Sequence, residues 1–180
     1  NPSHILLEYQ GGYAVRNLIG GIPPVSPAGI SGLGTSTRIP SRYIPVGQGF
    51  LMYGSTVGGD IIFNNNQRNF VKETDVNSNI LFRQNTDTIA NNTQKEIHER
   101  RRRSSAKIRL GFTSPNGYHK QILLGFMNEL ASAGIDKGYD APQLDNLSND
   151  MCFINNNVKL SIQGDGFFNR FRIFPLSVKI

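Results

Sequence analysis

Four aspartates recur at short intervals between residues 135 and 150, and they are the side chains of this chain best suited to chemistry. Carboxylates suit Ca²⁺, a hard cation that takes about six to eight oxygen ligands, although the spacing is not that of an EF-hand loop. The same groups cap turns by accepting backbone hydrogen bonds, and carboxylate pairs also serve hydrolases. We expect turn capping here, with calcium as the metal alternative. The residues are Asp136, Asp140, Asp145 and Asp150.

Four consecutive arginines carry much of the net charge of +6. Guanidinium groups bind phosphate and carboxylate in a forked geometry, so a surface glycan or another polyanion is a conceivable ligand. No aromatic residues interleave with the run to stack on bases, and we expect no nucleic-acid partner. We expect the run to be a solvated loop, with anion binding as the alternative. The run consists of Arg100, Arg101, Arg102 and Arg103.

Six tyrosines in a tryptophan-free chain offer flat, amphipathic rings. Such rings bind sugars when they are exposed, and they pack at core edges when they are not. We expect most of them at core edges. The candidates for a glycan surface are Tyr43, Tyr53 and Tyr139.

Other reactive groups do not form a recognisable catalytic pattern. The histidines His4, His98 and His119 lie far apart in sequence, without the spacing of a zinc site. No serine lies in a nucleophile elbow, and no glycine-rich phosphate loop leads into a helix. The only cysteine, Cys152, sits in an apolar run and is expected to be a buried, inert thiol. The sequence therefore predicts a protein that is not an enzyme and needs no cofactor.

The elements that would position these groups are short strands. Arg42–Tyr53 and Asp60–Phe70 are apolar, aromatic-rich runs separated by glycines, which predicts a β-hairpin with Phe50, Met52, Ile62 and Phe63 in the core.

Three later segments show clearer strand patterns. Residues 107–112 alternate strictly and lead through Ser114-Pro-Asn-Gly117 to a partner strand at 120–126. Residues 151–154 and 158–163 flank three asparagines that suit a tight hairpin. Residues 171–180 form a last strand, bent or on an edge because Pro175 cannot donate to a ladder.

Length and composition fit one globular domain of ordinary size or two small ones, and we favour one. The 180 residues are 38% hydrophobic and 18% charged, and no run approaches the roughly 18 apolar residues of a membrane helix, so no membrane insertion is expected. Many short strands predict an all-β, antiparallel, jelly-roll-like β-sandwich with long loops and little helix. We expect a single domain over residues 1–180, with a polar, Arg-rich loop insertion at 84–105. The start at Asn1-Pro2 indicates a piece of a longer polypeptide.

The order of motifs resembles that in secreted multidomain surface proteins of Bacteroidetes, in the module that commonly precedes the C-terminal sorting domain of type IX secretion. The motifs are Glu8–Tyr13 (EYQGGY), Tyr43–Phe50 (YIPVGQGF), Ile62–Arg68 (IFNNNQR), Leu81–Arg83 (LFR), Ile108–Leu110 (IRL), Gly138–Ala141 (GYDA), Asn149–Met151 (NDM) and Ser161–Gly164 (SIQG).

This resemblance implies a location outside the cell. It implies export across the outer membrane to the cell surface or the medium, with the type IX secretion machinery engaged through flanking regions. It also implies a noncatalytic module with a structural or adhesive role in a larger protein. The sorting domain itself is missing, and the arginine run departs from the family pattern. A carbohydrate-binding or anionic surface-ligand module is the alternative function.

Overall fold

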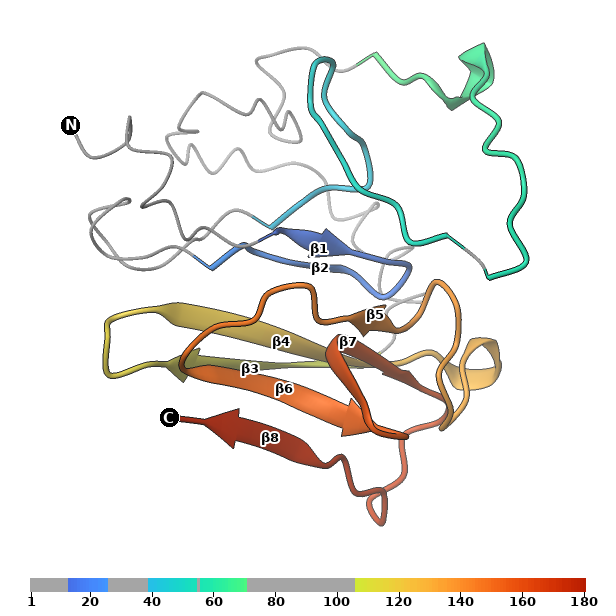
Figure 1. Ribbon diagram of the computed structural model, residues 1–180. Helices are drawn as coiled ribbons and strands as arrows, with labels where there is room; N and C mark the ends of the chain where they lie inside the picture. The colour runs from blue at the N-terminus through green and yellow to red at the C-terminus, as the bar shows by residue number, and fades with distance from the viewer. Residues whose placement is uncertain (1–12, 26–38, 55, 71–105) are drawn as a thin grey trace, which may run out of the picture. The chain divides into compact units, whose positions relative to one another are not determined.

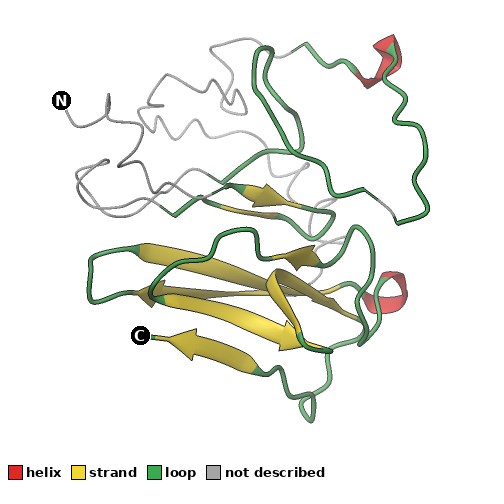
Figure 2. Cartoon of the chain, in the orientation of Figure 1, coloured by secondary structure: helices red, strands yellow, loops and turns green. Residues whose placement is uncertain are grey.

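The computed structural model describes residues 13–25, 39–54, 56–70 and 106–180. The protein is all-β there, as predicted: strands form two sheets, and helix is confined to the 3₁₀ segments Asn65–Gln67 and Asn128–Leu130 (Figure 2). None of the helices in these ranges has the length and apolar character needed to cross a membrane. The chain divides into two compact units, unit 1 (Asn1–Pro40 with Glu96–Ile180) and unit 2 (Ser41–Lys95). The predicted loop insertion at 84–105 lies outside the residues described.

The hairpin predicted from strict alternation is present in unit 1. Strands β3 (Lys107–Thr113) and β4 (His119–Phe126) pair antiparallel along their length (Figure 1). In the turn between them Gly117 adopts a φ of +80°, and its N–H donates to the Ser114 carbonyl over 3.0 Å. Glycine reaches this left-handed backbone without steric cost, so the turn chemistry read from the sequence closes the hairpin.

A second predicted hairpin joins β6 (Asp150–Asn155) and β7 (Val158–Asp165). Its two linking residues, Asn156 and Asn157, have φ values of +48° and +64°. Both central residues of a tight hairpin turn of this hand need positive φ, and asparagine tolerates it better than most side chains. The asparagine run therefore fixes the position of the turn.

Strand β7 is the centre of the larger sheet, whose order is β3-β4-β7-β6-β8. It pairs parallel with β4 and antiparallel with β6 and with the short strand β5 (Ala141–Pro142). The parallel ladder departs from the purely antiparallel expectation. The last strand, β8 (Leu176–Lys179), pairs with β6 and ends the sheet, which is one of the two positions expected for a strand with Pro175. It is shorter than the predicted 171–180, because residues 171–175 are not in a strand.

The first core cluster draws on three strands of this sheet. Phe126 ends β4 there and meets Phe168 and Phe174 edge to face, with ring centroids 5.1 and 5.9 Å apart. Edge-to-face contact is a favoured geometry for aromatic pairs, so these rings help to close the cluster. Its buried members are Ile122, Leu124, Phe126, Met151, Phe153 and Leu160.

The second core cluster forms where strands β1 (Val15–Arg16) and β2 (Gly21–Ile22) meet the sheet. Ile19, from the turn between these strands, packs closely over Gly125 of β4, where a Cβ would overlap its side chain. Leu123 of β4 belongs to this cluster, whereas its neighbours in sequence belong to the first. Strand β4 is therefore buried on both faces. Two apolar layers are compatible with a sandwich, and the jelly-roll path stays a prediction.

Unit 2 does not contain the predicted hairpin. Residues 41–54 and 56–70 form no strand, and their only helix is the 3₁₀ segment Asn65–Gln67 (Figure 2). The prediction that Phe50, Met52, Ile62 and Phe63 belong to a core is wrong, because all four are exposed. Strand-forming residue types without a paired neighbour cannot satisfy a ladder, and residues 41–54 and 56–70 make no ladder with any described residue.

Candidate functional site

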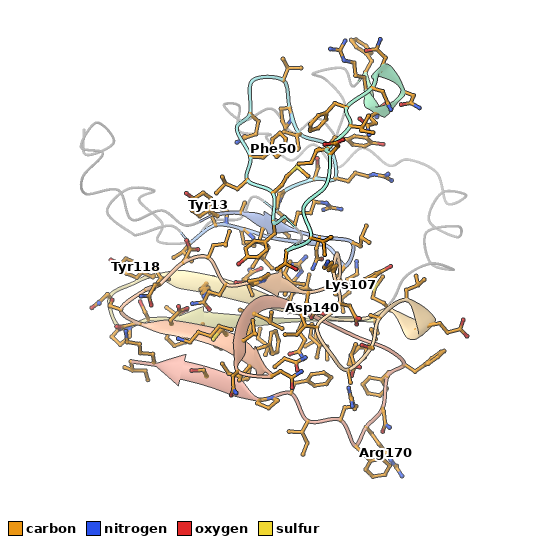
Figure 3. All side chains as sticks on the ribbon, turned by 45° about the vertical axis from the view of Figure 1, so that its right-hand side comes forward. Tyr13, Phe50, Lys107, Tyr118, Asp140 and Arg170 are labelled. Atoms are coloured by element: carbon orange, nitrogen blue, oxygen red, sulfur yellow. The ribbon has the colours of Figure 1, made fainter. Side chains whose placement is uncertain are left out.

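Asp140 is a buried carboxylate at the junction of a loop with β7 (Figure 3). It accepts hydrogen bonds from the backbone N–H groups of Asp136 (2.7 Å) and Gly164 (2.8 Å). Burial raises the pKa of Asp140, and the two amide donors oppose that shift. Both of its oxygens are thus engaged in holding the 136–140 loop against the sheet.

Two further carboxylates near Asp140 also hold loops in place through hydrogen bonds. Asp136 accepts from the Ser132 N–H (2.5 Å) and hydroxyl (2.8 Å). Asp165, which was not a candidate from the sequence, is buried. It accepts hydrogen bonds from Nε (2.8 Å) and Nη2 (3.0 Å) of Arg172. This forked pair raises the pKa of Arg172. Asp165 thereby ties the loop 166–175 to the end of β7.

A second polar group centres on the ion pair between Lys120 and Asp150, only 5% and 7% exposed. Gln143 donates to the other carboxylate oxygen of Asp150 and also to the carbonyl of Asp145 (2.7 Å). The side chain of Asp145 accepts a hydrogen bond from the backbone N–H of Tyr13. Burial raises the pKa of Asp145, and this hydrogen bond opposes the shift. Buried charges persist only when they are paired and hydrogen-bonded, and this group meets that condition.

Sequence reasoning missed Lys120, although a signal was present. In a strand, residues two apart share a face, so Lys120 belongs with Ile122 and Leu124 and not with solvent. A lysine on a buried face requires a carboxylate partner, and the partner that the fold supplies is Asp150, 30 residues further on.

The four aspartates therefore do not form one site. They divide between the Asp140 group and the Lys120 group, and most of their oxygens are used by backbone amides or a neighbouring cation. In the described part of the chain no three Asp, Glu, His or Cys side chains are arranged to hold a metal ion. The geometry fits the turn-capping interpretation and brings no calcium ligands together.

A small pocket lies beside the Lys120 group. Cys152 forms part of its wall and is buried, as predicted. Burial raises the pKa of the thiol, which leaves it protonated at neutral pH and poorly nucleophilic. The pocket is lined by Asn146, Leu147, Asp150, Cys152, Lys159, Ser177 and Lys179.

The three candidate tyrosines are not equivalent. Tyr139 is partly buried against the second core cluster, and its carbonyl accepts a 2.7 Å hydrogen bond from the Asn17 side chain, so it is a packing residue. Tyr43 and Tyr53 belong to unit 2 and are exposed. The Arg42 guanidinium lies over the Tyr43 ring, 5.2 Å from its centroid. Arg100, Arg101, Arg102 and Arg103 lie outside the described residues.

The segment 41–70 has the strongest potential for binding in the described residues. Phe50, labelled in Figure 3, forms an edge contact with Phe63. Their ring centroids are 6.5 Å apart, yet the two residues remain 48% and 70% exposed. Exposed apolar groups of this extent mark sites of interaction in folded proteins. The exposed large side chains are Tyr43, Ile44, Val46, Phe50, Leu51, Met52, Tyr53, Val57, Ile61, Ile62, Phe63 and Phe70.

One hydroxyl–imidazole contact resembles a nucleophile with its base. Thr113 Oγ1 and His119 Nδ1 lie 3.0 Å apart beside the turn that closes the β3–β4 hairpin. The two residues are directly opposite in the ladder, Thr113 exposed and His119 half-buried, which is the ordinary position of a cross-strand polar pair. The contact needs no catalytic explanation.

Fold and site together define an all-β protein with buried polar braces and an exposed apolar segment. Residues 12–180 match the model of one family, the domain of unknown function DUF8693. The chain belongs to this family. No curated protein and no solved structure matches it.

Proposed function

We propose that this chain is a noncatalytic extracellular β module of a larger secreted or cell-surface protein, with a structural or adhesive role. The observation that supports the proposal is that the buried carboxylates have structural partners, whereas many apolar side chains are exposed. The buried carboxylates Asp140, Asp150 and Asp165 brace loops and strands, while segment 41–70 presents apolar and aromatic side chains to solvent. A module that braces itself with its charges and exposes rings is suited to contact, not to reaction.

The location outside the cell rests on the motif order that resembles Bacteroidetes surface proteins. Under this proposal the polypeptide is exported by the type IX secretion machinery through its flanking regions. Protease treatment of intact cells that carry the full-length protein tests the location. Cleavage of this module without cell lysis is the expected result, and full protection until lysis would overturn it.

Carbohydrate binding is the second candidate, favoured by the exposure of Tyr43 and Tyr53. Tyrosine offers a flat apolar face to a sugar ring and a hydroxyl to its oxygens. The guanidinium of Arg42 over Tyr43 adds a cation that suits acidic glycans.

A glycan array followed by titration with the tightest polysaccharide tests this candidate. Changing Tyr43 and Tyr53 to Ala is expected to weaken binding by about tenfold, equivalent to about 1.4 kcal/mol. Tyr13→Ala is the matched control, since Tyr13 is also exposed but lies in unit 1, and its affinity is expected to stay within about twofold. Equal losses in both variants, or no binding on the array, would eliminate the carbohydrate candidate and leave the structural role.

A further inference from the structure

Strand β8 has a free backbone edge within the described residues. It ends the sheet and pairs with β6 alone, in the order Asp150↔Lys179, Met151↔Val178, Cys152↔Ser177 and Phe153↔Leu176. The Ile154 N–H donates to the Pro175 carbonyl over 2.9 Å, so Pro175 directs its hydrogen-bonding group toward β6. Because an antiparallel ladder alternates, the N–H and C=O groups of Leu176 and Val178 then point to the outer edge.

The proline before this strand leaves the outer edge intact. Its missing N–H would have faced β6, so Pro175 removes a bond from the inner ladder and none from the outer one. The outer edge therefore offers a regular run of donors and acceptors beginning at Leu176.

An apolar row accompanies this edge. Leu176, Val178 and Ile180 alternate along the strand and are 46%, 53% and 84% exposed. Leu176 and Val178 pair with Phe153 and Met151, which belong to the first core cluster. Directly paired residues share a face of the sheet, so this row continues the core to the edge of the sheet. A strand added here would cover apolar surface that is now exposed to water.

The opposite face of the same strand is positively charged. Lys179 and Ser177 of β8 line the small pocket together with Lys159 of β7. The pocket's carboxylate, Asp150, is already paired with Lys120. No ion pair joins Lys159 or Lys179 to a carboxylate in the described part of the chain. A strand added beside β8 would therefore meet Lys179 on this face, in the positive field that Lys159 of β7 adds to.

We propose that the outer edge of β8 docks an extended segment of another protein, apolar on one face and acidic on the other. The segment would add a strand to the sheet, as in β-augmentation, with main-chain bonds for affinity and alternate side chains for specificity. Its apolar side chains would cover Leu176 and Val178, and its carboxylates would meet Lys179, while Lys159 adds positive charge further along the same face.

Charge argues against a second copy of this chain as the occupant. Pairing β8 with its own copy would bring Lys159 and Lys179 of both molecules to one polar face, and each chain already has a net charge of +6. Lysine on short edge strands also serves to prevent unwanted pairing. A purely protective lysine provides no attraction for an acidic strand, whereas a docking lysine selects one, so the two roles predict different binding.

Two labelled peptides test the proposal by fluorescence anisotropy. One alternates valine and glutamate over eight residues, and the other alternates valine and lysine. The full 180-residue chain is expected to bind the acidic peptide at least about tenfold more tightly. Lys179→Glu should reverse this preference, while Arg68→Glu, the same charge change at an exposed position of unit 2, should leave it within about twofold.

Val178→Pro separates edge pairing from simple charge attraction. It removes an outward N–H and spares the bonds to β6, so acidic-peptide affinity should fall at least about tenfold with the circular dichroism spectrum unchanged. If this variant unfolds, Val178→Asp, which keeps the backbone and destroys the apolar row, is expected to show the same loss. Equal binding of both peptides, or undiminished binding by the folded Val178 variant, would overturn the proposal. Sedimentation showing a dimer that Val178→Pro abolishes would also overturn it, by making a second copy the occupant.

Discussion

The sheet of residues 106–180 and the segment 41–70 use the same apolar residue types with opposite results. Phe153 in β6 is 1% exposed, whereas Phe63 in the segment is 70% exposed. Both residues lie in short apolar runs bounded by turn-forming residues. The difference is that β6 has neighbouring strands on both sides, and the described residues of the segment form no ladder.

This comparison teaches that hydrophobicity alone does not decide burial in a β protein. A strand that lies between two others has the backbone groups of both edges satisfied within the sheet, so its side chains can be buried without leaving unpaired polar groups. Where partners are lacking, the same side chains form a surface, and in this protein that surface is the strongest candidate for contact with other molecules.

The largest expected effect is at the centre of the first core cluster. Phe153→Ala should reduce the free energy of unfolding by about 3–5 kcal/mol, because it removes a buried ring and leaves a cavity. Urea denaturation followed by circular dichroism measures the change. A loss below about 1 kcal/mol would mean that the cluster is not close-packed, and it would contradict the contrast drawn between buried Phe153 and the exposed segment 41–70.

The buried ion pair should rank next. Asp150→Ala leaves the Lys120 ammonium buried without a partner, which should cost about 3 kcal/mol of unfolding free energy. The double change Lys120→Met with Asp150→Leu removes both charges and should recover most of that loss. If the double variant is no more stable than the single one, the pair has a role beyond charge compensation.

Local chemistry made part of the fold predictable. The β3–β4 hairpin follows from strict alternation in residues 107–112 and from a turn ending in Gly117, and the β6–β7 hairpin follows from Asn156 and Asn157. In each case neighbouring residues determine both the period and the turn. Such information is contained within a few residues of sequence.

Nonlocal pairing explains what was not predicted. The parallel ladder of β4 with β7 and the bond from Lys120 to Asp150 join residues 30 or more positions apart, and no local pattern encodes them. The prediction of a hairpin in segment 41–70 was wrong for a related reason. Its apolar residues Phe50, Leu51, Met52 and Tyr53 are consecutive and have no period that selects one face. For the candidate site residues, the sequence predicts that the aspartates cap turns, and Asp136 and Asp140 have that role. Their division into two groups depends on the tertiary fold and could not be predicted.

Close packing between the two parts of unit 1 gives a smaller effect. Gly125→Ala places a methyl group where the Ile19 side chain lies, and the resulting displacement should cost about 1–3 kcal/mol. Chemical denaturation measures it, with Gly49→Ala as the control, because a Cβ there meets no other atom. In the double variant Ile19→Ala with Gly125→Ala the Cγ2 atom that the new methyl group would meet is absent, so a loss smaller than the sum of the two single losses would locate the clash at this pair.

The buried carboxylate Asp140 should make stability depend on pH. Its pKa is raised on folding, mainly by burial, so the folded state binds its proton more tightly than the unfolded state does. The contribution is therefore most favourable below the ordinary pKa of 3.8 and is lost as pH rises through the folded pKa. Asp140→Asn should remove this component, so the stability difference between wild type and variant should shift in favour of the variant across that window. Denaturation curves of wild type and Asp140→Asn, measured side by side from about pH 3 to about pH 7, test this. A shift of opposite sign would contradict burial as the cause of the raised pKa.

The smallest expected effect is at the exposed end of the comparison. Phe63→Ala should change the unfolding free energy by less than about 0.5 kcal/mol, because a ring that already contacts water loses little on removal. Measured beside Phe153→Ala, it is the same substitution in the two regions. A loss near 3 kcal/mol would show that Phe63 is buried in solution and that the segment is part of a core. A negligible loss of stability together with weakened ligand binding would instead assign the ring to the contact surface, because only a surface residue can lose binding without loss of fold.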